Sequence, residues 1–475
     1  MIRREYAALD DGRFRRDLVE TEDGWRLPDM AITDALIELN MRRTVARKIG
    51  RYMEGLNERI TNRETQDDGA PDNRVAVPYA RKLVNTVVGY MFRPSYTQYA
   101  SDDEAYKAAL DDAFWDNNEQ SKTSKIGKLM SIFGVAYELH YTVQRNGAPA
   151  PRFAPVPTED LLPVYSNDIE PEIVAAVRRY AVDMPGEYRS VERLEVYYDD
   201  VIHEFDVYQD ESGLHVLPRI FTDVDGSKQR SVIEHGYGMV PVSVYRNNDT
   251  IVGDFEHVID LIDAYDVLLS DSLNEFDRFA WAYLVLRNIS MSDENIDDAK
   301  RKRVLEVFGE NGSIDFLTKQ VQTEFIKYMR EWIREEIHKQ THIPDMTDEH
   351  FAGNQSGIAI RYKLSDLENI ASVKEVGFRE GLRRRIDLLN AFWRTQGRPV
   401  RNVRDVDIIM QRNVPENFIE QAEIIGKLRG HISHKTLLDQ VATFVDDASA
   451  EMDAIEQEQD VLFGGEEAGD DSADS

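Results

Sequence analysis

Residues 253–283 carry one long helical pattern that has an apolar face and an anionic face. Apolar residues recur at the i, i+3, i+4 spacing of one helix face, namely Phe255, Val258, Ile262, Tyr265, Leu269, Leu273, Phe276 and Phe279. The acidic residues of the other face are Glu256, Asp260, Asp263, Asp271 and Glu275, and no Lys or Arg occurs between Asp254 and Asp277. A helix of about 30 residues spans roughly 45 Å, whereas the average globular helix has about 11 residues. A chain with this segment must fold around a long rod and must cover, or use, both of its faces.

The segments before this rod predict an α+β fold. Helical patterns cover residues 31–60, 78–92, 102–119 and 121–133, and Ser101 with Glu104 forms the capping box of the third. From residue 134 to residue 246 the apolar period changes to two, which is typical of strands. The expected strands are 134–144, 152–157, 173–183, 191–198, 201–208, 214–221 and 239–245. Residues 1–250 are therefore interpreted as one mixed region of helices and sheets.

After the rod, helices alternate with short breaks. The pattern predicts a strand at 284–290, a helix at 293–308, a strand at 313–318 and a second long helix at 321–342. Residues 343–357, IPDMTDEHFAGNQSG, break helicity through Pro344, Gly353 and Gly357. Next are expected a helix over 358–396, a strand at 403–411 and helices at 416–429 and 433–457. The segment from Glu451 to Ser475 contains ten acidic residues and no Lys or Arg, so its last dozen residues are predicted to be disordered.

The composition argues against several classes of protein. The 475 residues are enough for about three domain-sized units. The formal net charge of −31, from 57 basic and 88 acidic residues, argues against a general nucleic-acid binder, which shows a basic footprint. The absence of cysteine excludes disulfide scaffolds and thiolate metal sites, and it fits assembly in a reducing cytoplasm. No run approaches the roughly 18 apolar residues of a membrane span, and the first residues, MIRREYAALDDGRF, lack the apolar region of a signal peptide.

No motif for bond chemistry is complete. The Gly-Lys pairs at 127–128 and 426–427 lack the other residues of a phosphate-binding loop. Residues 353–357, GNQSG, do not have the spacing of a nucleophile elbow, and we interpret them as a loop before a helix. His338 and His342 lie one helical turn apart but lack the Glu of a zinc protease, so they are interpreted as surface or interface histidines. The sequence therefore predicts no catalytic residue, no metal site and no cofactor.

Two charged faces admit more than one interpretation. The acids of 253–283 form a continuous stripe rather than a converging pair, which disfavours a metal-dependent nuclease. Both simple solvation and a wall facing a channel are compatible with that stripe. The basic residues within 31–60 are more simply a solvated face than a site for DNA or a partner; they are Arg42, Arg43, Arg47, Lys48 and Arg51.

Three blocks of the sequence resemble the portal proteins of long-tailed double-stranded DNA phages. The first is the turn Asn247-Asn248-Asp249 followed by LIDAYDVLLSDSLN at 261–274, which is similar to the stem helix of that family. The second, residues 351–393, has the turn GNQSGIA before a long helix with a Lys-Glu pair and a basic middle. The third is ISHKTLL at 432–438, followed by an acid-rich helix. A looser match at 73–94 departs from the family pattern G-Y-x-x-G-x-P, because Arg93 stands where relatives often have Gly.

This resemblance implies an α+β portal-protein fold with a mixed α/β wing, long stem helices, a small α/β clip insert and a helical C-terminal crown. The expected parts are 1–250 (wing), 251–283 (stem helix), 284–320 (clip), 321–342 (second stem helix), 343–357 (tunnel loop), 358–398 (long wing helix), 399–412 (strand returning to the wing), 413–460 (crown) and 461–475 (acidic disordered tail). With the helical phase of 253–283, it further implies that a channel is lined by Glu256, Asp260, Asp263 and Asp271. The tunnel loop is expected to bring Asp345, Asp348, Glu349, His350, Asn354 and Gln355 nearest to DNA.

In function, the resemblance implies a non-enzymatic ring, usually a dodecamer, at one vertex of the capsid. Double-stranded DNA would be packaged and ejected through its channel, and the ring would contact the terminase, head–tail connector proteins, and the major capsid and scaffolding proteins. Such a chain is made in the cytoplasm of the bacterial host and built into the virion, with no membrane partner. The alternative is a structural adaptor of the head–tail connector, although such adaptors are usually much shorter, and a metal-dependent DNA-processing enzyme is the third possibility.

Overall fold

The computed structural model of the chain divides into two units. The first contains Met1–Pro344 and Asp366–Arg412, and the second contains Asp345–Ser365 and Asn413–Ser475. The structure describes residues 13–64, 71–145, 147–183, 190–210, 213–222, 227–279, 283–287, 313–317, 323–346, 357–398, 400–413, 426–428, 431, 433, 451–452 and 454–455. The elements that position the candidate site all belong to the first unit.

The N-terminal helices are α1 (Asp29–Glu54), α2 (Glu58–Thr61), α3 (Tyr79–Met91), α4 (Glu104–Asn117) and α5 (Glu119–Phe133). α1 ends at Gly55, whose φ of 76° lies in the left-handed region that glycine enters at little cost. α4 begins after Asp103, whose carboxylate accepts a hydrogen bond from the Tyr106 N–H. The predicted capping box is therefore wrong in its cap residue, because Asp103 reaches the first turn while the Ser101 hydroxyl accepts only from the Asp103 N–H.

The largest sheet packs against α1. Its strand order is β1-β7-β8-β9-β10-β11, and β14 also pairs with β10. The strands are β1 (Phe14–Arg15), β7 (Leu161–Tyr165), β8 (Ile173–Asp183), β9 (Ser190–Tyr197), β10 (Val201–Asp210), β11 (Gly213–Pro218) and β14 (Val232–Glu234). Leu36 and Leu39 of α1 share one buried core with Val177 and Leu194 of the sheet. Alternate side chains of the strands thus bury one face of the sheet under the helix.

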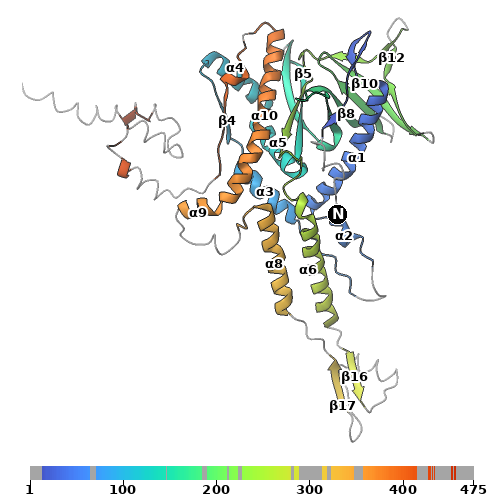
Figure 1. Ribbon diagram of the computed structural model, residues 1–475, viewed down its shortest axis with the longest axis vertical. Helices are drawn as coiled ribbons and strands as arrows, with labels where there is room; N and C mark the ends of the chain where they lie inside the picture. Colours follow the sequence, from blue (N-terminus) through green and yellow to red (C-terminus); the bar gives the residue numbers. More distant parts are fainter. Residues whose placement is uncertain are drawn as a thin grey trace, which may run out of the picture. The chain divides into compact units, whose positions relative to one another are not determined.

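A second sheet has the strand order β15-β5-β6. It contains β5 (Val135–Arg145), β6 (Ala148–Val156) and β15 (Val242–Arg246), and the long helix α10 (Ser365–Thr395) packs on it (Figure 1). The contact is close, because a Cβ added at Gly381 would lie 2.3 Å from the ring of Tyr245. The smaller sheets each contain two strands: β2 (Val19–Thr21) with β3 (Gly24–Arg26), β12 (Ile220–Thr222) with β13 (Lys228–Arg230), and β4 (Thr97–Ala100) with β18 (Asp407–Met410).

Two long helices extend away from these sheets. A 3₁₀ turn, Glu256–Val258, leads into α6 (Ile259–Phe279), and α8 (Thr323–Thr341) follows the antiparallel pair β16 (Tyr283–Arg287) and β17 (Ser313–Leu317). Figure 1 shows α6 and α8 side by side, with β16 and β17 at their far ends. We call α6 and α8 the stem helices. We call the other described helices and sheets of the first unit, except β16 and β17, the body.

Most of the predicted elements are confirmed within a few residues. Seven strands, β5, β6, β8, β9, β10, β11 and β15, and the helices α1, α3, α4, α5 and α8 lie where the apolar periods place them. The rod begins with the 3₁₀ turn Glu256–Val258 instead of an α-helix from residue 253, and α6 is described as far as Phe279. The helix expected from residue 358 is divided into α9 (Gly357–Lys363) and α10. The period of the sequence does not reveal β4 or β7.

The strand expected at 403–411 is present as β18. It pairs with β4, which lies within the residues expected to form the wing, and not with either of the larger sheets. The helix expected at 293–308 and the acidic tail lie outside the described residues, and so does most of the expected crown.

Candidate functional site

The anionic face of α6 binds another segment of the same chain. Residues 73–77, which we call the strap, run along this face. Three backbone N–H groups of the strap donate to α6 side chains one turn apart: Val77 to Asp266 (3.0 Å), Val75 to Ser270 (3.0 Å) and Asn73 to Asn274 (2.6 Å). Four residues of a helix rise about 6 Å and two residues of an extended chain span about 6.6 Å, so the two repeats match. The α6 side chains therefore supply the hydrogen-bond acceptors that the backbone of a neighbouring β-strand would otherwise provide.

Side-chain contacts extend this interaction along α6. They are Tyr52 to Asp263 (2.9 Å), Asn57 to Asp266 (2.9 Å) and Asn73 to Asp277 (2.6 Å). Asp263 is only 7% exposed and Asp266 only 1%. Burial raises the pKa of Asp266, and the hydrogen bonds from Asn57 and Val77 oppose that rise. This part of α6 is polar because it satisfies buried hydrogen-bonding groups, and not because it faces water.

The four predicted channel residues occupy different environments. Asp260 is exposed, and Glu256 accepts a backbone N–H at 3.3 Å where the stem begins. Asp271 pairs with Arg63 of the same chain at 2.6 Å, and its side chain remains 48% exposed. Asp263 requires a correction, because a residue that is buried within its own subunit cannot face an open channel. Helical spacing alone could not separate Asp263 from the others, since all four acids follow the same period.

The apolar surface of the stem helices is covered only near the body. Toward β16 and β17, Leu273 is 44% exposed and Phe276 is 71% exposed. On α8, the exposed fractions are 57% for Phe325, 62% for Tyr328 and 44% for Trp332. Aromatic side chains bury about 150–250 Å² each when they are covered. Large apolar side chains exposed on two neighbouring helices indicate a site of interaction.

A buried ion pair joins the start of the stem to α10. The Lys374 ammonium group contacts the carboxylate of Asp254 and the amide oxygen of Asn247. Lys374 is 1% exposed and Asp254 is 8% exposed. Burial lowers the pKa of Lys374, and Asp254 opposes this effect. A cavity of about 370 Å³ lies beside the pair, between the ends of the stem helices and α10. Removing one partner of such a pair leaves an uncompensated buried charge, so the pair holds the stem to α10.

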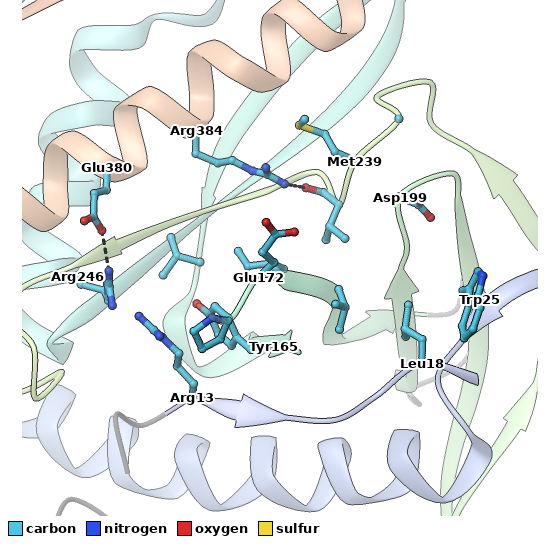
Figure 2. A pocket seen from close by; sticks show the side chains of 16 residues that line it. Arg13, Leu18, Trp25, Tyr165, Glu172, Asp199, Met239, Arg246, Glu380 and Arg384 are labelled. Carbon is cyan, nitrogen blue, oxygen red and sulfur yellow. Dashed lines mark hydrogen bonds and ion pairs between the residues drawn. The ribbon is translucent and has the colours of Figure 1, made fainter. Parts of the chain in front are cut away.

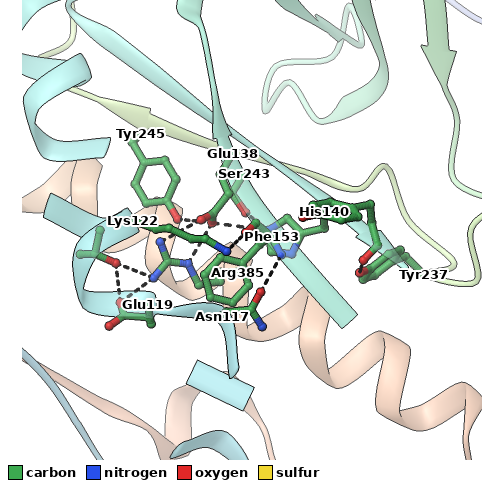
Figure 3. A network of polar contacts seen from close by, with 12 residues as sticks. Asn117, Glu119, Lys122, Glu138, His140, Phe153, Tyr237, Ser243, Tyr245 and Arg385 are labelled. Atoms are coloured by element: carbon green, nitrogen blue, oxygen red, sulfur yellow. Dashed lines mark hydrogen bonds and ion pairs between the residues drawn. The ribbon is translucent and has the colours of Figure 1, made fainter. Parts of the chain in front are cut away.

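A larger buried network lies within the body (Figure 3). Arg385 of α10 donates two hydrogen bonds to Glu138, at 2.8 and 3.0 Å, and one to Glu119 at 2.7 Å. Tyr245 donates to Glu138 at 2.8 Å. Burial would raise the pKa of Glu138, but Arg385 and His140 outweigh it and lower this pKa to about 2. Burial lowers the pKa of His140. The network connects α10, α5, β5 and β15 and is closed to solvent, so its role is structural.

A cavity of about 700 Å³ opens in the body next to β1 (Figure 2). Its charged lining residues are three arginines and three acids: Arg13, Arg246, Arg384, Glu172, Glu380 and Asp199. Arg246 pairs with Glu380 at 2.7 Å, and Arg384 donates to the carbonyl of Val240 at 3.1 Å. Because the charges balance, the cavity has no preference for a polyanion. Among the described residues that line it, no nucleophile is paired with a base.

The two histidines of the sequence motif have separate environments. His338 is half-buried and lies 2.8 Å from the Tyr79 hydroxyl and 2.7 Å from the Ile343 carbonyl oxygen, so it has partners within its own chain. His342 is exposed, as predicted. In the part of the chain that the structure describes, no group of three or more His, Cys, Asp or Glu side chains could hold a metal ion. No helix among the described residues is both long enough and apolar enough to cross a membrane.

The basic residues of α1 are largely paired with acids of the same chain. The shortest contacts of three of them are Arg42 to Glu38 (2.6 Å), Arg43 to Glu159 (3.8 Å) and Arg51 to Glu58 (2.6 Å). These pairs reduce the positive charge that α1 presents to solvent, which favours the interpretation of this face as a solvated surface rather than a DNA site.

Several candidates cannot be compared with the structure. Of the six tunnel-loop residues, only Asp345 is described; outside the described residues lie Asp348, Glu349, His350, Asn354 and Gln355. The structure also shows residues that sequence reasoning missed, above all Lys374 and Arg385 on α10. They are eleven positions apart (385 minus 374), about three turns, and so lie on one face among buried apolar residues. A basic residue within an apolar helix face is a signal for a buried acidic partner.

Comparisons with known proteins agree with the resemblance seen in the sequence. The family model for phage portal proteins, SPP1 Gp6-like, matches residues 37–461. A portal protein of Clostridium phage phiCD119 is 22% identical over 396 residues, which cover 80% of this chain and 83% of the relative. A portal protein of Bacillus phage SPP1 is 25% identical over 405 residues, which cover 82% and 77%. Among solved structures, a chain of the virion of a native gene transfer agent particle is 10% identical with a TM-score of 0.41, over 82% of this chain and 91% of that chain.

Proposed function

The chain belongs to the family of SPP1 Gp6-like phage portal proteins, whose model matches residues 37–461, and we propose that its copies form a ring at one capsid vertex through which DNA is packaged and ejected. The family is structural rather than enzymatic, in agreement with the absence of any complete catalytic motif from the sequence. The phage origin of both curated relatives supports a location in the virion.

The observation that carries the ring is the uncovered apolar surface of the stem helices. Two stem helices of one copy leave Leu273, Phe276, Phe325, Tyr328 and Trp332 between 44% and 71% exposed. Further copies would cover this surface. When two different patches of identical copies meet, the contacts repeat in one rotational direction and close into a ring if the rotation allows it. A dodecamer is the size that the family resemblance suggests.

The channel would be lined by acids that remain accessible on a single copy. Asp260 is exposed and Asp271 half exposed, whereas Asp263 is excluded by its burial. Duplex DNA carries one negative charge per ~1.7 Å of its axis, and carboxylates repel it within a Debye length of ~8 Å at physiological salt. An acidic wall repeated around a ring would therefore let DNA slide rather than bind. Glu256 is proposed to line the channel at the end of the stem nearest the body. Residues 345–356 are proposed to form the loop nearest to DNA.

The proposed partners are the terminase, which would supply the packaging motor, the head–tail connector proteins, and the capsid and scaffolding proteins. The segment between α6 and α8, with the β16–β17 pair, is the proposed clip that meets the connector. The connector adaptor is not favoured as a second function, because this chain covers 83% and 77% of two curated relatives that are themselves named portal proteins.

Negative-stain images and mass measurements of the purified full chain test this function. We expect closed rings with a central hole at least as wide as duplex DNA. A chain that stays monomeric at micromolar concentration in every salt condition would contradict the proposed function.

A further inference from the structure

α8 carries the same pair of residue types three times. An aromatic residue is followed two positions later by a basic residue at Phe325–Lys327, Tyr328–Arg330 and Trp332–Arg334. Each series advances by three and then by four residues, so its members lie above one another along the helix. We call Phe325, Tyr328 and Trp332 the aromatic stripe, and Lys327, Arg330 and Arg334 the cationic stripe. All six side chains are exposed.

The two stripes lie on opposite flanks of α8. Successive helix residues are about 100° apart, so residues i and i+2 are about 200° apart. The buried residues Ile333 and Ile337 occupy the face between the flanks, and α6 runs beside α8 (Figure 1). Each copy of the stem therefore presents aromatic rings in one direction and positive charges in the opposite direction.

The stripes are complementary in chemistry and in spacing. An ammonium or guanidinium group within about 6 Å of an aromatic ring centroid is attracted by the ring. Each basic residue lies two positions, or about 3 Å, further along the helix axis than its aromatic counterpart, a difference that a Lys or Arg side chain spans. A rotation about an axis parallel to α8 keeps every residue at its height. In a ring whose axis runs parallel to α8, the stripes of adjacent copies would therefore meet in register.

We propose that the cationic stripe of one copy packs on the aromatic stripe of the next copy. This inference rests on the proposed ring and identifies one of its contact surfaces. The occupant of the aromatic stripe is a second copy of this chain, because the matching stripe lies on the same helix with the same spacing. The contact joins two different surfaces, so it continues around a ring instead of ending at a dimer. Glu324, Glu331 and Glu335 form a third face, opposite Ile333, which this contact leaves open as an acidic wall.

The first test reverses charge on two faces of the same helix. The variant with Lys327→Glu, Arg330→Glu and Arg334→Glu should require at least about tenfold more protein for half-maximal ring assembly, measured by mass photometry. The matched control, Glu324→Lys, Glu331→Lys and Glu335→Lys, changes as many charges and should still form rings. Circular dichroism and thermal unfolding should show that both variants remain folded, since the altered side chains are exposed.

The second test separates the ring–cation contact from simple apolar burial. Phe325→Leu, Tyr328→Leu and Trp332→Leu keep an apolar surface but remove the aromatic rings. This variant should need at least about tenfold more protein for half-maximal ring assembly, as the variant with the reversed cationic stripe does. Normal assembly of the leucine variant, or of the variant with the reversed cationic stripe, would overturn the proposed contact while the ring itself stands. A wild-type chain that forms no rings would overturn both the contact and the proposed function.

Discussion

The body and the stem use charged side chains in opposite ways. In the body, the side chains of Arg385 and Glu138 are completely buried and hydrogen-bonded to each other. Because Arg385 also bonds Glu119, this one side chain fixes α10 against both β5 and α5. In the stem, charged and aromatic residues of α8 remain at the surface of a single copy. The buried charges of the body find their partners within one subunit, whereas the stem helices leave charged and aromatic side chains exposed for contact with further copies.

The largest expected effect is the loss of Arg385 from the body. Arg385→Met leaves Glu138 and Glu119 as buried carboxylates without their cation, which should lower the free energy of unfolding by about 3–5 kcal/mol. Denaturant unfolding of the full chain measures this change. The control is Arg145→Met, which removes an exposed pair with Asp116 and should change stability little. Equal effects of the two substitutions would contradict a special role for the buried network.

An intermediate effect is expected where the body and the stem meet in the strap. Asn274→Leu removes the acceptor of the Asn73 N–H and should cost about 1–3 kcal/mol locally. Hydrogen exchange of residues 73–77, followed by mass spectrometry, should accelerate. The control is Ser272→Ala, because the Ser272 hydroxyl donates only to the Leu268 carbonyl of its own helix. Unchanged exchange in Asn274→Leu would show that α6 does not hold the strap.

A smaller effect is expected from pH, and it should be confined to the body. His140 has a pKa lowered by burial from its usual 6.5, so the folded chain keeps it neutral while the unfolded chain takes up a proton. The free energy of unfolding should therefore fall as the pH drops below about 6.5. The Glu138 contribution, with a folded pKa of about 2 against the usual 4.5, is complete above pH 4.5 and is lost only as the pH falls toward 2.

This pH dependence can be assigned by substitution. His140→Gln should reduce the loss of stability between pH 7 and pH 5, as measured by denaturant unfolding at both values. The remaining loss should come from His203 and His235, whose pKa values burial also lowers. His342→Asn changes an exposed histidine and should leave the loss as it is in the unmodified chain. If both variants lose the same stability on acidification as the original chain, another group controls the response.

The smallest effect on stability is expected at Asp260, where a substitution should change DNA packaging and not folding. Asp260→Lys should leave unfolding unchanged, because the side chain is exposed, whereas Asp263→Lys should destabilise the chain by burying an ammonium group beside Tyr52. In assembled particles, Asp260→Lys should reduce the packaged DNA per particle if this residue faces the channel. Normal packaging would assign Asp260 to an outer surface.

Much of the fold could be predicted because local periods report local structure. The period of two between residues 134 and 246 indicates the strands of the body, and the helical periods of α6 and α8 indicate the stem helices. The candidate site could be predicted only in part. Lys374 and Arg385 look like ordinary basic residues of a long helix, and their acidic partners lie 120 and 247 residues away in the chain. No local pattern specifies contacts of that separation.

The acids of α6 separate what the sequence period can predict from what only the tertiary contacts show. The spacing of the residues alone places Asp260 and Asp263 on one long helix and directs them away from its main apolar stripe, because helix geometry fixes side-chain direction around the helix axis. The tertiary structure decided that Asp260 meets solvent while Asp263 and Asp266 bind Tyr52, Asn57 and the strap, about 200 residues earlier in the chain. The helical period of the sequence specifies the direction of each side chain around the helix axis. It does not specify which distant segment of the chain packs against that side chain.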